Sequence, residues 1–173
     1  MPFNELVKQI ESSSEFRNFK KQHPDARLCA GFFIIDMYNK DNKQAIDYKT
    51  KESIFSFNFE NDKIAVQEDS LIHIQGRPEL KNIDDRITID TEDMTAIAKK
   101  ALTDNKVFSK LQKIIAVMQK YSGKETDDKE IQIWNVTCML EGFGIVSILI
   151  DSSSGNLLKF EKKSVMDFMR RQK

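Results

Sequence analysis

The sequence lacks the features that mark a secreted or membrane-embedded protein. Its two cysteines, Cys29 and Cys138, stand far apart and belong to no Cys-x-x-Cys motif, so they provide no disulfide framework. The N-terminal residues are polar and charged from position 4 onward, which excludes the continuous apolar segment of a signal peptide. No apolar run approaches the roughly 20 residues of a membrane span. We therefore expect a cytoplasmic protein without a membrane partner.

An excess of charge of either sign is also missing. The 27 basic and 27 acidic side chains give a formal net charge of zero at pH 7. A protein that binds nucleic acid or anionic lipid without specificity usually has an excess positive field. For the chain as a whole we therefore expect no nucleic-acid partner.

The sequence does contain enough apolar material for a folded core. It is 40% hydrophobic over 173 residues, which suffices for one full domain or two small ones. In the first half, the apolar spacing predicts a helix from Phe3 to about Lys21, interrupted near Ser12–Ser14. Strands are predicted at 27–36, at 54–59, where phenylalanines alternate with polar residues, and at 63–67.

His23-Pro24-Asp25 follows the predicted helix and matches the loop motif of a J-domain co-chaperone. A J-domain places this motif between two long helices, so polar, helical residues should come next. Residues 27–36 are instead a nearly continuous apolar run with aromatic and β-branched side chains, which predicts a buried strand. Proline also disfavours the helical conformation in the residue before it. We interpret the motif as a helix-to-strand turn.

Residues 68–85 contain Gly76 and Pro78 and follow no sustained apolar period, so we predict a connector there. The second half then predicts a short strand, a helix capped by Thr91 and a further helix, at 86–90, 91–102 and 107–122. Three strands and a terminal helix complete the chain, at 131–140, 144–151, 156–161 and 164–171.

The two halves share one order of elements, a helix followed by antiparallel strands. This order predicts an α+β fold in which antiparallel sheets are each packed on a helix, produced by internal duplication of a helix-plus-β-meander unit. The expected boundaries are 1–75 for the first unit, 76–85 for the connector and 86–173 for the second unit with its C-terminal helix. A single fused domain is the alternative that the sequence leaves open.

Parts of the second half resemble the repeat of the PepSY family. They are the segment from Ile87 to Leu102, the strand Trp134-Asn-Val136, and the hairpin from Gly144 to Leu158. The family shares a helix that begins after an Ile-Thr/Ser-x-Glu-Glu-like sequence, then an aromatic-x-Val strand and a hairpin of the form Val-x-Ile-Asp-x-x-x-Gly-x-Leu. The resemblance implies a cystatin-like α+β unit with a regulatory or protein-binding role. The resemblance assigns a catalytic role to no residue of this chain.

No residue pattern indicates a catalytic, cofactor or metal site. Both cysteines lie in apolar runs, where a buried thiol is the expected state, and a nucleophilic cysteine would need His23 or His73 as its base. One histidine among apolar neighbours, such as His73, does not make a metal site. The paired carboxylates Asp84-Asp85 and Glu92-Asp93 suit acid–base chemistry, but they equally suit a turn and a helix start.

We expect a non-catalytic protein-binding or regulatory module that uses an exposed sheet face, an edge strand such as 54–59, or the C-terminal segment. The competing hypothesis is a small-molecule or enzymatic site in the cavity between a sheet and its helix. A third is nucleic-acid binding through the basic C-terminus. The candidate contact residues are Trp134, Phe57 and Cys138 for the cavity, and Met166, Phe168 and Met169 for the C-terminal segment.

Overall fold

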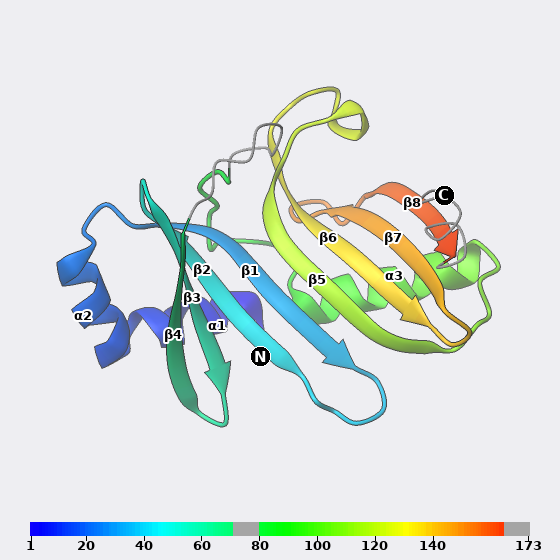
Figure 1. Cartoon of the computed structure of the whole chain (residues 1–173). Helices are drawn as coiled ribbons and strands as arrows, with labels where there is room; N and C mark the ends of the chain where they lie inside the picture. Colours follow the sequence, from blue (N-terminus) through cyan, green and yellow to red (C-terminus); the bar gives the residue numbers. More distant parts are fainter. Residues whose placement is uncertain (71–79, 165–173) are drawn as a thin grey trace, which may run out of the picture.

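The computed structural model describes residues 1–70 and 80–164. The helices in these ranges are α1 (Phe3–Glu11), α2 (Ser14–Gln22) and α3 (Thr91–Asp104), with a 3-10 turn η1 (Lys124–Thr126) (Figure 1). The strands are β1 (Arg27–Asp36), β2 (Lys43–Lys49), β3 (Ser53–Glu60), β4 (Lys63–Ser70), β5 (Leu111–Tyr121), β6 (Ile131–Leu140), β7 (Gly144–Asp151) and β8 (Leu157–Ser164). No helix among the described residues has the length and apolar character needed to cross a bilayer.

All of these strands belong to one antiparallel sheet, in the order β4-β3-β2-β1-β5-β6-β7-β8. The prediction of separate sheets, each packed on its own helix, is therefore wrong. The pairing of β1 with β5, from Gly31↔Met118 to Asp36↔Lys113, overturns it. These are the first strands of the two meanders. Left apart, each would present an unpaired edge, and their pairing satisfies those backbone groups.

The helices lie on one side of the sheet, behind it in the view of Figure 1. We call this side the core face; it holds the side chains of Phe33, Ile114 and Trp134, which belong to the hydrophobic core. Side chains alternate between the faces of a sheet, so the intervening residues point to the opposite side. We call that side the open face.

The first helical segment is interrupted as predicted. α1 ends at Glu11, and α2 begins two residues after Ser12. The hydroxyl of Ser12 donates to the carbonyl oxygen of Lys8 at 2.6 Å, and Ser13 caps α2 by accepting from the backbone N–H of Phe16 at 3.1 Å. Serines favour such local bonds over a continuous helix, which explains the break.

His23-Pro24-Asp25 is a helix-to-strand turn, as interpreted from the sequence. α2 ends directly before it, and β1 begins two residues after it. The backbone N–H of Ala26 donates to the carbonyl oxygen of His23 at 3.1 Å. The His23 ring lies 4.6 Å from the ring centroid of Phe55, so it packs against β3.

The helix predicted over 107–122 is wrong, because most of these residues form β5. Their apolar spacing fits a helical face, but residues 114–118 are apolar without a break, and such a run suits a buried strand equally well. β-Branched residues in the run favour the strand. In the structure Ile114, Ala116 and Met118 alternate onto the core face.

Residues 86–90 form no strand, contrary to the prediction; they are a segment that anchors α3 to the sheet. The carbonyl oxygen of Ile89 accepts a hydrogen bond from the Trp134 indole at 2.7 Å. α3 is capped by Asp90 rather than by Thr91, because the Asp90 carboxylate accepts from the backbone N–H of Thr91 at 2.6 Å.

The sheet is bounded by β4 and β8. β3 lies between β2 and β4, so the prediction that residues 54–59 form an edge strand is wrong. The start of the predicted connector, 68–70, belongs to β4, and Ser164 belongs to β8, while the rest of the predicted helix 164–171 lies outside the described residues. The strands predicted at 27–36, 63–67, 131–140, 144–151 and 156–161 are confirmed to within a few residues.

The core packs α1 closely onto the centre of the sheet. The ring of Phe3 lies edge-on to Phe33 and Trp134, with centroid distances of 6.3 and 6.2 Å. Gly31 makes this approach possible, because a Cβ there would lie 2.6 Å from Cε2 of Phe3. The apolar side of α1 is fully buried by this packing.

Candidate functional site

The residues predicted to line a ligand cavity lie in the core instead. Trp134, Phe57 and Cys138 are each 0% exposed and belong to one hydrophobic cluster. The indole N–H of Trp134 is already bonded to a backbone carbonyl. These side chains therefore offer no surface to a partner. The other candidates, Met166, Phe168 and Met169, lie outside the described residues.

The two thiols are buried and protonated at neutral pH. Burial is the main cause that raises the pKa of both Cys29 and Cys138 to about 12, and the Asp47 carboxylate contributes to the rise for Cys29. The Cys29 Sγ also donates to the carbonyl oxygen of Asp47 at 3.3 Å. Because the thiolate is the nucleophile, a thiol that stays protonated at neutral pH is poorly reactive. Across 1–70 and 80–164, no three His, Cys, Asp or Glu side chains gather as metal ligands.

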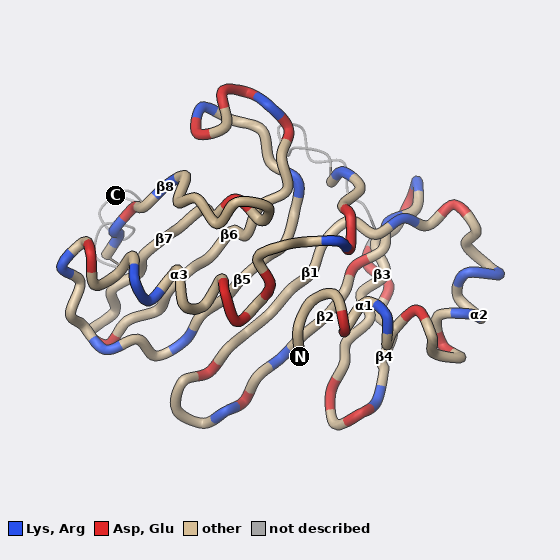
Figure 2. The backbone as a smooth tube through the Cα atoms, turned by 180° about the vertical axis from the view of Figure 1, so that it is seen from behind, with Lys and Arg blue, Asp and Glu red and all other residues tan. Residues whose placement is uncertain are grey.

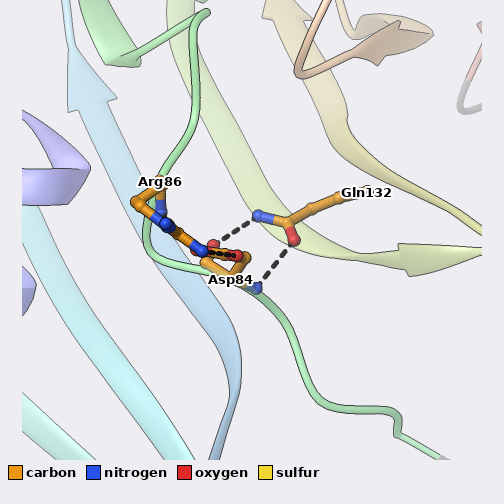
Figure 3. A network of polar contacts seen from close by, with 3 residues as sticks. All are labelled: Asp84, Arg86 and Gln132. Atoms are coloured by element: carbon orange, nitrogen blue, oxygen red, sulfur yellow. Dashed lines mark hydrogen bonds and ion pairs between the residues drawn. The ribbon is translucent and has the colours of Figure 1, made fainter.

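Of the paired carboxylates, Asp84 and Asp93 hold the chain in place, and Glu92 alone lines a cleft. The side-chain amide of Gln132 on β6 donates to the carbonyl oxygen of Asp84 at 2.7 Å and accepts from the backbone N–H of Asp84 at 2.9 Å (Figure 3). Arg86 donates to the Asp84 carboxylate at 3.2 Å. Hydrogen bonds from Arg86 lower the pKa of Asp84. A carboxylate held in its ionised form is a poor proton donor near neutral pH. Asp93 completes the capping box of α3.

The open face has an apolar patch at the centre of the sheet. It consists of Phe32 and Ile34 of β1 and Ile115 and Val117 of β5, and we call it the central patch. Phe32 lies opposite Val117, and Ile34 lies opposite Ile115, so the four side chains form one compact block. All four are half-buried, and none belongs to the core cluster. Their outer surfaces are thus left to the solvent.

Small, polar and charged side chains border the central patch. On β6, Asn135 and Thr137 lie opposite the two β5 residues of the patch, and on β2, Ala45 and Lys43 lie opposite its two β1 residues. At one end, Lys113 pairs with Asp36 at 3.8 Å. An apolar centre inside a polar rim is the usual anatomy of a protein–protein interface.

The signal for the central patch is present in the sequence. A strand of an antiparallel sheet with one solvated face alternates apolar and polar residues. Residues 32–35 and 114–118 are instead apolar without a break. Continuous apolar runs of this kind indicate strands whose two faces are both covered by other groups. The two runs form one apolar patch only because β1 pairs with β5, which places them side by side. Sequence reasoning assigned one run to a buried strand and the other to a helix, and so missed the patch.

A cleft of about 430 Å³ lies between α3 and the hairpin of β1 and β2. One residue of the central patch, Ile34, is among the residues that line this cleft. Apolar and polar groups share its lining, among them Phe33, Ile35, Gln44, Thr95 and Lys99. The three core residues predicted to line a cavity between sheet and helix are not part of its wall.

Comparison with known proteins gives a likeness of fold. No family model matches the chain, and no curated protein sequence matches it. Among solved structures, the crystal structure of a "putative lipoprotein" from Clostridium difficile 630 matches with a TM-score of 0.52 and 13% sequence identity, over 86% of this chain and 90% of that chain. At this identity the likeness concerns the fold alone. The PepSY resemblance of the second half stays a prediction.

Proposed function

We propose that the protein is a non-catalytic protein-binding or regulatory module, and that its partner binds the central patch. The observation that carries this proposal is the apolar character of both faces of β1 and β5, when the helices cover only one face. Exposed apolar area costs about 25 cal/mol per Å² relative to buried area, so a partner that covers the patch gains free energy. We place this module in the cytoplasm, the compartment predicted from the sequence.

The chemistry of the open face defines the partner. Its binding surface should present apolar side chains to the four patch residues and hydrogen-bonding groups to Asn135 and Thr137. Because the patch and this part of its rim are uncharged, salt should weaken the complex only slightly. The central strands of a sheet are rigid, so the partner meets a preformed surface with little ordering cost.

Site-directed photo-crosslinking tests this proposal. A photoreactive amino acid at Thr137, which borders the patch, should capture one partner in stoichiometric amount. The matched position is Gln67 on β4, which is exposed on the same face but lies far from β5 in the strand order. The proposal predicts capture at 137 and none at 67. Equal capture at both positions, or capture at 67 alone, would contradict it.

A second candidate function is small-molecule binding in the cleft beside α3. Its volume of about 430 Å³ falls in the usual range of ligand sites, roughly 300 to 1,000 Å³. Ala96 is exposed and lines the cleft, so Ala96→Trp should fill it. Native mass spectrometry of the purified protein would favour this function if it detected a retained small molecule that the variant lost.

A further inference from the structure

β4 is an edge strand that pairs with β3 on one side only; no strand of the described part of the chain lies on its other side. Figures 1 and 2 both show it at the border of the sheet, at the end where α2 lies. An edge strand presents backbone donors and acceptors that are unpaired within the sheet. Such an edge can therefore pair with a strand of another chain.

The turn between β3 and β4 shows how the β4 backbone is oriented. Asn61 and Asp62 have φ angles of +51° and +59°, the signature of a two-residue type I′ hairpin turn. In this turn the carbonyl oxygen of the residue before it accepts from the N–H of the residue after it. Those residues are Glu60 and Lys63, which lie opposite each other in the ladder. The backbone groups of Lys63 therefore point at β3.

The free edge of β4 presents the backbone of every second residue. In an antiparallel ladder, hydrogen-bonded pairs alternate with pairs that are not hydrogen-bonded. Counting from Lys63, the backbone groups of Ile64, Val66 and Glu68 point away from β3. Each of these residues offers one donor and one acceptor at the free edge.

Val66 is an apolar side chain that the fold leaves uncovered. It lies opposite Phe57, which is fully buried on the core face, yet Val66 is 45% exposed. The aromatic cover from α2 reaches Phe57, because Phe16 and Phe19 pack on it with centroid distances of 5.5 and 5.0 Å. Val66 is not part of the hydrophobic core cluster. A further strand beside β4 would cover it.

The order of residues in β4 makes this strand complementary to itself. When two copies pair antiparallel with Val66 at the centre, Ile64 of each copy lies opposite Glu68 of the other, so all outward backbone groups find partners. The same register places Lys63 opposite Asp69 at both ends of the strand pair. No ion pair joins Lys63 or Asp69 to another described residue. Both charges are thus available to a second copy.

Other registers lack this match of charges. A shift by two residues keeps the hydrogen-bonding pattern, since side chains repeat with that period along a strand. In one direction the shift places Lys63 opposite Gln67, and in the other it places Asp69 opposite Ala65. Opposite charges that face each other across two strands stabilise the pair, so the register centred on Val66 is favoured.

We propose that the chain forms a symmetric dimer through β4, in which two sheets join edge to edge into one antiparallel sheet. The two-fold axis passes between the two Val66 residues at right angles to the sheet, so the helices of both copies lie on the same side. This contact goes beyond the protein-binding function, because β2 and β3 separate β4 from the central patch.

The dimer is expected to be weak. One pair of strand edges buries less area than a standard interface, so we expect a dissociation constant of about 100 µM. At the low micromolar concentrations of a crosslinking experiment β4 is then unpaired. Gln67 therefore keeps its use as the matched position in the test of the central patch.

Sedimentation velocity of the full chain, from about 5 to about 500 µM, tests the proposal. The wild type should change from monomer to dimer and form no larger species, because a two-fold contact closes after two copies. Val66→Pro should stay monomeric. Proline removes an N–H that faces the free edge but none that bonds β3, so this variant should remain folded, as circular dichroism can verify.

Charge reversals test the register. Lys63→Glu and Asp69→Lys each place like charges opposite each other at both ends of the strand pair, so each should weaken the dimer about tenfold. The double variant restores opposite charges and should recover the wild-type affinity, which no folding defect of the single variants would explain. The matched control is Lys129→Glu, the same charge change at an exposed position between η1 and β6, which should leave association unchanged.

Three results would overturn the proposal. The first is a wild type that stays monomeric up to about 500 µM. The second is growth beyond the dimer, which pairing of β4 with β8 of the next copy would produce. The third is a dimer that persists in folded Val66→Pro or that the double charge variant fails to restore.

Discussion

The Nε1 atom of Trp134 donates a hydrogen bond to the carbonyl oxygen of Ile89 over 2.7 Å. Trp134 is fully buried on β6, and Ile89 lies in the segment that leads into α3. The bond therefore fixes the start of α3 against the core face of the sheet. A buried indole whose polar atom is satisfied in this way is an anchor of the core, which accounts for the position of this tryptophan.

Trp134→Phe should lower the free energy of unfolding by about 1 to 3 kcal/mol, because it leaves the partly buried carbonyl of Ile89 without this donor and removes part of a packed side chain. Urea denaturation followed by circular dichroism measures the change. Tyr121→Phe is a suitable control, since the Tyr121 hydroxyl donates to Glu125 at 2.6 Å near the surface. That control should cost less than about 1 kcal/mol, and equal losses in the two variants would contradict the account.

Gly31→Ala should destabilise the protein by about 1 to 3 kcal/mol, because the added Cβ would lie 2.6 Å from the ring of Phe3. Gly144→Ala is the matched control, since the nearest atom there is 3.3 Å away on the flexible side chain of Leu140. A double variant that also contains Phe3→Leu should recover part of the loss. If Gly31→Ala unfolds at the same temperature as the wild type, α1 does not pack on β1 as described.

Asp36 should stabilise the β1–β2 turn in a pH-dependent way. Backbone amides of Asn39 and Tyr38 both donate to its carboxylate at 2.9 Å and, helped by Lys113, lower its pKa. A carboxyl whose pKa is lowered by folding stabilises the protein above its unfolded pKa, about 4, and this stabilisation is lost as the pH falls through the folded value.

Thermal unfolding of the wild type and Asp36→Asn, compared across pH, tests this expectation. The wild type should unfold at the higher temperature at pH 7, and the two midpoints should converge below about pH 4 as Asp36 becomes protonated. A difference that stays constant down to pH 2 would show that the charge of Asp36 plays no part.

The two thiols should react with a thiol reagent only when the protein unfolds. Both are 0% exposed, and the pKa of each is raised to about 12. Labelling at pH 8 should be slow in buffer and complete within the mixing time in concentrated urea. Gln67→Cys, which places a thiol at an exposed position, should label at once under both conditions. Rapid native labelling of Cys29 or Cys138 would contradict the described core.

Local features of this fold could be predicted from the sequence, whereas its long-range pairings could not. The serines at 12 and 13 predicted the break between α1 and α2. The alternating phenylalanines of β3 predicted a strand with one buried face. The pairing of β1 with β5 joins residues that are far apart in the chain, and no local pattern specifies it. Without that pairing, the apolar run 114–118 fitted a helix as well as a strand, and its two faces could not be told apart.

The candidate site was missed for the same reason. Large apolar residues such as Trp134 and Phe57 are natural candidates for a binding site in a sequence, but both are buried in the core. The central patch is built from residues one position away from core residues, for example Phe32 beside Phe33. Which of two adjacent apolar side chains faces the solvent depends on the position of the helices, and this is a property of the assembled sheet.

The affinity of the captured partner for variants of the central patch tests the main claim most directly. Isothermal titration calorimetry would compare the wild type with Val117→Lys, with Val117→Thr, which preserves the side-chain shape, and with Gln67→Lys as the control on the same face. We predict a dissociation constant at least about tenfold weaker for Val117→Lys, a smaller weakening for Val117→Thr, and no change for Gln67→Lys, all with unfolding temperatures close to that of the wild type. Unchanged affinity in the well-folded Val117→Lys variant would show that the partner binds elsewhere.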